Sequence, residues 1–193
     1  MKALPFRIPK TGDPAILSQI DSGKQFYDIL HKHPEYQITH VVRGSGTLIC
    51  DEYLGRFEAG DTILIGPNQP HVLKSDEEYY APSADKSIYG LSLFFNYQSL
   101  EKRLFGLEEA EELRIFLDHA KGGLKLSKAI ANDTRRILDE VQRKKNIDLI
   151  ISFLELLKCL MSDVNVTILS VRESSLSETE GQRMNEVMLF TLS

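Results

Sequence analysis

The sequence predicts a mainly β domain that is followed by an α-helical segment, with the change near residue 98. Before this position, short apolar runs alternate with Gly, Pro, Asn and Asp, which is typical of an all-β barrel or sandwich. Beyond it, apolar residues recur with the period of helices. A chain of 193 residues with 42% apolar composition is long enough to bury one core and carry a helical extension.

The first part is expected to contain strands of ordinary length joined by glycine turns. The prolines and glycine of the preceding arm, Met1 to Pro14, do not favour regular structure there. The predicted strands are Ala15–Ile20, Gln25–Leu30, Gln37–Val42, Thr47–Cys50, Tyr53–Phe57, Thr62–Ile65, Val72–Lys74 and Ser87–Phe95.

The second part is expected to contain helices over residues 108–120, 128–144 and 147–161. Gly122-Gly123 ends the first of these helices, and Ser127 is a suitable N-cap for the second. Residues 172–180 are polar and indicate a linker, and a helical pattern resumes over 181–193. We therefore divide the chain into a barrel with its arm (1–98), a helical dimerisation segment (99–163), and a linker with the start of another helix (164–193).

The third predicted helix carries two apolar stripes about a quarter turn apart. The first contains Ile150, Leu154, Leu157 and Met161, and the second contains Leu149, Phe153, Leu156 and Leu160. A helix packed on a barrel buries one stripe, so the other is buried either by neighbouring helices or by a second subunit. The spacing of the first stripe is typical of a coiled-coil seam and favours a homodimer.

The charge, the cysteines and the apolar runs of the sequence limit the classes of function that we expect. The net charge is −5, and the basic groups Arg135-Arg136 and Arg143-Lys144-Lys145 are interpreted as solvated helix faces, so the chain is not expected to bind DNA by itself. Cys50 and Cys159 are expected to be free thiols in a reducing compartment. We find no signal peptide and no apolar run long enough to span a membrane, which favours a cytoplasmic protein.

Histidines mark the expected site. His31 and His33 are one residue apart, so on a strand both side chains point to the same face. His71 follows the Gly66-Pro67 turn signal much later in the chain. If the intervening strands form a small barrel, all three imidazoles can converge inside it.

These residues resemble the cupin superfamily, and more narrowly the N-terminal sensing and dimerisation domain of AraC-type bacterial transcription regulators. The first cupin motif corresponds here to His31, His33, Gln37 and Gly44, and the second to Gly60, Pro67 and His71. The resemblance implies a cupin barrel (a double-stranded β-helix or jelly roll) followed by an α-helical segment. It also implies a cytoplasmic, dimeric transcription regulator whose barrel binds a small-molecule effector.

Regulators of this kind carry a C-terminal domain with two helix-turn-helix units, which this sequence lacks. Residues Gly181 to Val187 resemble the start of the helix that leads into that domain, so we expect the sequence to be a fragment. The resemblance implies that DNA is bound only through the missing domain. It also implies a population-shift mechanism in which the arm closes over the effector.

The interior residues permit several kinds of site. Imidazoles and an amide suit a polar effector such as a sugar or a carboxylate. Three imidazoles and the oxygen of Gln37 also suit a divalent Fe, Mn, Ni, Cu or Zn ion, although metal-binding cupins usually carry glutamate at that position. As a third interpretation, the histidines only hydrogen-bond across the barrel. No catalytic residue and no obligatory cofactor is expected; the rival function is a metal-dependent cupin enzyme, a dioxygenase or isomerase.

Neighbouring positions extend the expected ligand site. Thr39 and Arg43 share the parity of Gln37 if the strand has no bulge, so both are candidates to line the cavity. Arg43 would either pair with an anionic effector or extend to solvent at the barrel mouth. His40 has the opposite parity and is expected to face away, and His119 is expected to face solvent. Tyr27 and Tyr36 suit either the rim or the core.

Overall fold

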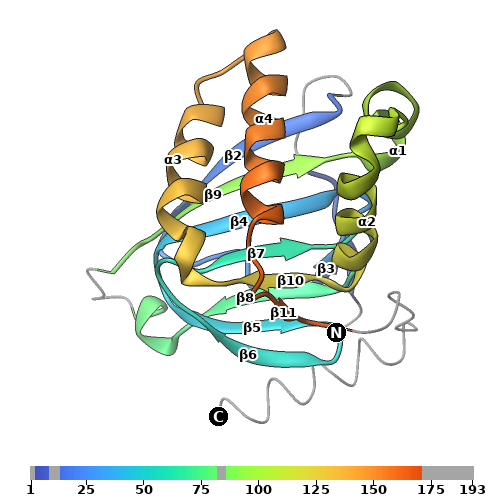
Figure 1. Cartoon of the computed structure of the whole chain (residues 1–193). Helices are drawn as coiled ribbons and strands as arrows, with labels where there is room; N and C mark the ends of the chain where they lie inside the picture. Colours follow the sequence, from blue (N-terminus) through green and yellow to red (C-terminus); the bar gives the residue numbers. More distant parts are fainter. Residues whose placement is uncertain (1–2, 9–13, 82–85, 171–193) are drawn as a thin grey trace.

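The computed structural model describes residues 3–8, 14–81 and 86–170. Two sheets face each other and form a cupin-type barrel (Figure 1). The smaller sheet has the order β1-β3-β8-β5-β6, and the larger has the order β11-β10-β7-β4-β9-β2. All pairs are antiparallel except the short parallel pair of β1 with β3. The strands are β1 (Leu4–Pro5), β2 (Ile16–Gly23), β3 (His31–Lys32), β4 (Tyr36–Arg43), β5 (Gly46–Cys50), β6 (Tyr53–Phe57), β7 (Thr62–Ile65), β8 (His71–Ser75), β9 (Ile88–Phe95), β10 (Leu124–Leu126) and β11 (Thr167–Ile168).

Seven of the eight predicted strands are confirmed, with small shifts at their ends. The predicted strand Gln25–Leu30 is wrong, because these residues form an irregular crossing from β2 in the larger sheet to β3 in the smaller one. Phe26 and Leu30 are nevertheless buried, in two different apolar clusters. Their apolar spacing therefore reflects two separate anchoring points.

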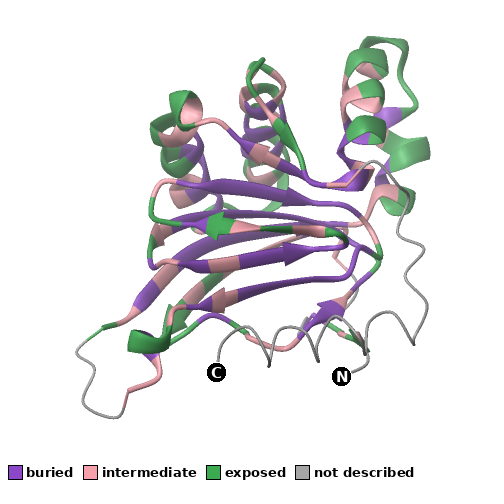
Figure 2. Cartoon of the chain, turned by 90° about the horizontal axis from the view of Figure 1, so that it is seen from below, coloured by how far each residue is buried: buried purple, intermediate pink, exposed green. Residues whose placement is uncertain are grey.

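The central strands of the larger sheet are covered on both faces. Tyr36 and Ile38 on β4 pack in the cluster that the helices share, while Gln37 and Thr39 on the same strand point into the barrel. All four side chains are buried, so the strand shows no alternation of buried and exposed residues. Figure 2 shows buried residues along most of the strands and exposed residues mainly on the outer sides of the helices.

The helices lie on the outer face of the larger sheet (Figure 1). The three predicted helices are confirmed as α2 (Glu111–His119), α3 (Ala131–Val141) and α4 (Asn146–Met161), and α1 (Tyr97–Leu100) was not predicted. Single helical turns at Glu77–Tyr79, Glu101–Phe105, Glu108–Ala110, Ala120–Gly122 and Lys128–Ile130 complete the helical structure of the described residues. Ser127 occupies the N-cap position of the turn Lys128–Ile130, as predicted, but its hydroxyl donates to Asp163 and makes no capping bond.

The predicted division at residue 98 does not separate strands from helices. β10 pairs with β7, and β11 pairs with β10, so two strands from the second part complete the larger sheet. These short strands follow helices and lack a clear alternating pattern of their own, so they were not predicted. Residues 171–193, which contain most of the predicted linker and the last predicted helix, lie outside the described residues.

Burial does not separate the two apolar stripes of α4 into one buried stripe and one exposed stripe. Phe153, Leu156 and Leu160 of the second stripe are fully buried against the sheet. In the first stripe Leu157 is also buried, at 1% exposure, whereas Ile150 is 37% exposed and Leu154 and Met161 are half-buried. The placement of Leu157 on a surface for a second subunit is therefore wrong, because its side chain belongs to the buried cluster that the helices share with the larger sheet.

Two further expectations concern the cysteines and the presence of membrane-spanning helices. Cys50 and Cys159 are free thiols, as predicted. Within the described ranges, the helices are too short or too polar to cross a membrane.

Candidate ligand-binding site

Three imidazoles meet inside the barrel. His31 on β3 pairs in register with His71 on β8, and His33 follows β3 directly. The ring centroid of His31 lies 4.3 Å from that of His71 and 6.0 Å from that of His33, and one ring nitrogen from each residue falls within 4.8 Å of the others. Gln37 on β4 reaches this group from the facing sheet. The predicted convergence of these four side chains is therefore confirmed as geometry.

The backbone fixes which nitrogen of each ring carries the proton. Nδ1 of His31 lies 2.8 Å from the carbonyl oxygen of residue 29, Nδ1 of His33 lies 3.0 Å from that of residue 35, and Nδ1 of His71 lies 2.8 Å from that of residue 69. A carbonyl oxygen only accepts, so Nδ1 is the donor in each case. In the neutral rings, each Nε2 therefore has a free lone pair.

A chain of hydrogen bonds orients the amide of Gln37. Ser92 Oγ donates to the Asp21 carboxylate at 2.5 Å, so its contact with Thr39 Oγ1 at 2.8 Å is one in which Thr39 donates. Thr39 Oγ1 in turn accepts from Gln37 Nε2 at 2.8 Å. Because the ionised carboxylate at the far end only accepts, every donor in the chain points toward it and Gln37 Oε1 points toward the imidazoles.

Acceptors consequently face one another at the centre of the site. Gln37 Oε1 lies 3.0 Å from His33 Nε2 and 3.1 Å from His71 Nε2, and the two tautomers leave no proton between these atoms. Such an arrangement is unfavourable unless a cation or a hydrogen-bond donor enters it. The cluster is thus built to receive a donor or a positive charge.

Burial keeps the imidazoles neutral. It lowers the pKa of His31 to about 4, although the bond to the carbonyl of residue 29 acts in the opposite direction. Burial also lowers the pKa of His33, and it lowers that of His71 well below the usual value, where the other two imidazoles add to the effect. The three rings therefore act as neutral ligands and acceptors near pH 7.

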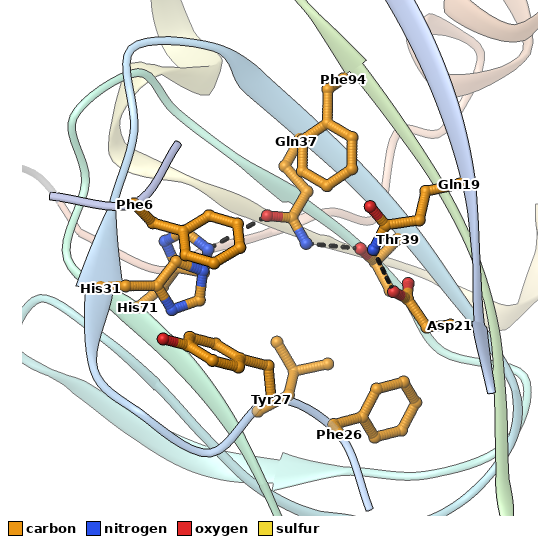
Figure 3. A pocket seen from close by; sticks show the side chains of 11 residues that line it. Phe6, Gln19, Asp21, Phe26, Tyr27, His31, Gln37, Thr39, His71 and Phe94 are labelled. Carbon is orange, nitrogen blue, oxygen red and sulfur yellow. Dashed lines mark hydrogen bonds between the residues drawn. The ribbon is translucent and has the colours of Figure 1, made fainter. Parts of the chain in front are cut away.

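The imidazoles form one end of a small cavity of about 70 Å³ (Figure 3). A cavity needs about 10–15 Å³ of such volume to hold one water molecule, so there is room for several waters or a small ligand. The cavity is lined by Phe6, Gln19, Asp21, Phe26, Tyr27, His31, Gln37, Thr39, His71, Leu73 and Phe94. His33 belongs to the cluster but is not among the residues that line the cavity.

The N-terminal arm forms part of this wall. Backbone bonds from Leu4 N to Leu30 O at 3.2 Å and from Phe6 N to Lys32 O at 2.9 Å hold the arm along β3. The Phe6 ring lies 5.1 Å from both the Tyr27 and the His31 rings. The arm therefore contains a short paired segment, contrary to the sequence expectation, and it places an aromatic ring over the imidazoles.

Of the remaining residues considered from the sequence, some line the cavity and others lie on the surface or on the helix side of the sheet. Thr39 lines the cavity, whereas a bulge between Val41 and Arg43 changes the parity of the strand, so Arg43 is exposed and donates to the carbonyl of Ser87. Tyr36 lies on the helix side, where its hydroxyl donates to the carbonyl of Leu117.

The two histidines assigned elsewhere lie as expected. His40 is buried on the helix side of β4, and its Nδ1 is 2.9 Å from the hydroxyl oxygen of Thr62. His119 is exposed.

Several lining residues were not predicted. Gln19 and Asp21 lie two residues apart on β2 and share the inward face, but the predicted strand ended at Ile20. Extending this strand by one residue would have placed the Asp21 carboxylate inside the barrel, so a signal was present. Phe6 and Phe94 carried no comparable signal, because their positions depend on pairing between distant segments.

The donor set fits a divalent transition metal. His31, His33 and His71 form a group whose ligand atoms converge, and Gln37 adds a neutral oxygen. The Nδ1 bonds to carbonyl oxygens hold the rings as they are held in metal sites. These four residues would hold the ion, and the ion would supply Lewis acidity to a ligand in the cavity.

The fold and the cavity define a cupin-type barrel with an internal binding site. A family model described as the AraC-like ligand binding domain matches residues 14–123. The chain therefore belongs to the family of AraC-like ligand-binding domains, as its motifs indicated. A comparison with curated protein sequences finds no match.

Solved structures with similar folds include regulators and cupins. The AraC-like transcriptional activator CuxR is 9% identical with a TM-score of 0.46, over 81% of this chain and 51% of CuxR. ToxT from Vibrio cholerae is 13% identical with a TM-score of 0.46, over 90% of this chain and 66% of ToxT. A cupin protein from Bacteroides fragilis is 21% identical with a TM-score of 0.35, over 46% of this chain and 71% of that protein. This chain spans about half the length of CuxR.

Proposed function

We propose that this chain is the effector-sensing domain of an AraC-type transcription regulator and that the effector binds in the cavity beside the imidazoles. The observation that carries the proposal is the group of converging acceptors inside the barrel of a chain from this family. A small polar molecule such as a sugar fits this chemistry, because its hydroxyls donate to imidazole nitrogens and to an amide oxygen. The domain is proposed to act by sensing, not by catalysis.

The arm offers a route from binding to regulation. Phe6 lies over His31, and its backbone N–H donates to the carbonyl of Lys32 beside the short pair of β1 with β3. An effector that touches Phe6 favours the docked arm over the undocked arm, and this difference in affinity shifts the population. Deleting residues 1–12 is expected to weaken effector binding, and unchanged affinity would contradict this role of the arm.

A screen of sugars, sugar acids and divalent metals by thermal shift tests the proposed function. A ligand at 100 times its dissociation constant stabilises the native state by about 2.7 kcal/mol, which is readily measured. The shift should disappear in Thr39→Val, which alters the cavity wall, and persist in His119→Gln, where an exposed histidine is replaced. A ligand whose shift survives Thr39→Val and other cavity substitutions binds elsewhere, and the proposal then fails.

Dimerisation through α4 is part of the proposed function. Ile147, Ile150 and Ile151 are 64%, 37% and 49% exposed, and they form an apolar surface on the first two turns of this helix. A second copy of the chain would remove this surface from water. The proposed interface keeps Ile150, Leu154 and Met161 from the predicted stripe, whereas Leu157 contributes to the monomer core.

The acceptor cluster also favours a second candidate, a metal-dependent cupin enzyme. Three neutral imidazoles with an amide oxygen could hold a redox-active ion. Metal analysis of protein purified without chelator, combined with oxygen-consumption assays, separates the two functions. A stoichiometric redox metal with turnover favours the enzyme, whereas effector binding by metal-free protein favours the sensor.

A further inference from the structure

The chemistry of the cavity wall goes beyond a general polar effector. We infer that the effector is a small organic cation that carries a primary ammonium group and at least one further hydrogen-bond donor. This inference rests on the proposed function, because it concerns the same cavity. Three properties of the wall support it: its charge, the direction of its hydrogen bonds and its aromatic surface.

The formal charge of the wall is negative. Asp21 is the one carboxylate among the lining residues, and no lysine or arginine of the described chain lines the cavity. Arg43, the cation expected from the sequence, is exposed and bonded to the carbonyl of Ser87. An anionic effector would therefore enter the barrel without a partner for its charge, which is costly in a buried site.

The hydrogen-bonding groups at both ends are acceptors. The Asp21 carboxylate accepts from Ser92 Oγ and from Gln19 Nε2, at 2.5 Å each, and a carboxylate has further lone pairs that can accept. At the other end, Gln37 Oε1 and the Nε2 atoms of the imidazoles also accept. The complementary ligand has donors at both of its ends.

The position of the carboxylate favours a cation at its end. Asp21 is part-buried, and burial raises its pKa, which means that the charged form is destabilised in the free protein. A positive group beside the carboxylate would offset this cost. The two ends of the cavity thus differ, with ammonium expected at Asp21 and a neutral donor at the imidazoles.

Aromatic rings form much of the rest of the wall. Phe6, Phe26, Tyr27 and Phe94 line the cavity, and Figure 3 shows several of these rings around the space between Asp21 and the imidazoles. Ring faces attract cations and exclude water, and a carboxylate beside aromatic rings is a favourable setting for an alkylammonium group. A neighbouring hollow shares Asp21, Phe26 and Tyr27 and is also lined by Asp28 and Lys24, so its two carboxylates outnumber its one cation.

Three probes of nearly equal size test the inference. The protein is first treated with a chelator to remove any bound metal, and the chelator is then removed. Ethanolamine supplies an ammonium group and a hydroxyl, ethylene glycol supplies two hydroxyls, and glycolate supplies a hydroxyl and a carboxylate. Binding is measured by NMR titration of the backbone amides. A charge-assisted hydrogen bond at Asp21 predicts that ethanolamine binds about tenfold more tightly than ethylene glycol, and glycolate should bind most weakly.

Variants identify the source of the preference. Asp21→Asn should abolish the preference for ethanolamine over ethylene glycol, and Asp118→Asn, which removes an equal charge from the exposed face of α2, should leave it intact. If glycolate binds best, if charge makes no difference, or if none of the probes binds, the inference is overturned. The proposed function survives these outcomes if the screen yields another ligand in the cavity, and fails only if no compound binds there.

Discussion

At the scale of single residues, the orientation of Gln37 depends on a carboxylate that lies three hydrogen bonds away. Asp21 accepts from Ser92, which orders Thr39 and then the amide. The sequence could predict the imidazoles, because the spacing of His31 and His33 alone places them on one face. It could not predict this chain of bonds, because Asp21 and Ser92 meet only through the register of β2 with β9.

Replacing Ser92 with alanine tests this chain of hydrogen bonds. Thr39, which is buried, would lose its acceptor and Asp21, which is part-buried, would lose a donor, so the free energy of unfolding should fall by about 1–3 kcal/mol. Urea denaturation followed by circular dichroism measures the change. Ser99→Ala, on the exposed side of α1, is the matched control and should change stability little. An equal effect of both substitutions would contradict the account.

Acid should destabilise the fold through its buried histidines. Burial lowers the pKa of His31 and of His40 from 6.5 to about 4, so the unfolded chain binds protons that the folded chain does not. Stability is then fully present above pH 6.5 and declines toward pH 4, by on the order of 1 kcal/mol per pH unit for each such imidazole.

Comparing variants separates the contribution of the buried histidines to the pH dependence of stability from the contribution of the carboxyl groups. Burial raises the pKa of Asp21 and Asp51, which opposes the trend but does so equally in every variant. His40→Gln should make the dependence of the unfolding free energy on pH less steep by about one proton, and the exposed control His119→Gln should leave it unchanged. An unchanged slope in His40→Gln would contradict the neutral state assigned to that ring.

At the scale of elements, α4 joins the helical layer to the barrel. Phe153 is fully buried, with its ring 5.1 Å from that of Phe95 on β9. Phe153→Ala should lower the free energy of unfolding by about 3–5 kcal/mol, because it leaves a cavity that the sheet cannot close. Ile151→Ala on the exposed side of the same helix should cost about 0.5 kcal/mol. Thermal or urea unfolding of the two variants distinguishes these positions.

The turn before His71 is an element fixed by close packing. A Cβ added at Gly66 would lie 2.1 Å from the carbonyl oxygen of Lys121, so Gly66→Ala must displace the backbone of the helical turn Ala120–Gly122 that follows α2. We expect a loss of about 1–3 kcal/mol in urea denaturation. Gly23→Ala has no atom closer than 3.9 Å to the added carbon and is the matched control. Similar stabilities for both variants would contradict this packing.

Element types were largely predictable because apolar period and turn residues are local signals. The segment Gln25–Leu30 was mistaken for a strand because its apolar residues are buried without being paired in a sheet. β10 and β11 were missed because they are short and become strands only where β10 joins β7 and β11 joins β10. Arg43 was a candidate to line the cavity only on the condition that the strand has no bulge, and the bulge that is present leaves no mark in this sequence.

At the scale of the whole molecule, we propose a sensor that dimerises through α4. Ile150→Glu should shift the chain toward monomer in analytical ultracentrifugation, because it places a charge in the proposed interface at a position that is 37% exposed in the monomer. Lys158→Glu, another exposed position on α4, is the control and should not change the mass. A wild-type chain that stays monomeric at high concentration would contradict the proposed dimer.

The central claim, that the imidazole cluster is part of the receptor for the effector, is tested most directly by long-range ¹H–¹⁵N NMR of the five histidines. In the free protein, His31, His33 and His71 should show neutral rings protonated at Nδ1. Any effector identified by thermal shift should change the resonances of these three rings and leave His119 unaffected. An effector that binds tightly but leaves all three rings unchanged would contradict the claim.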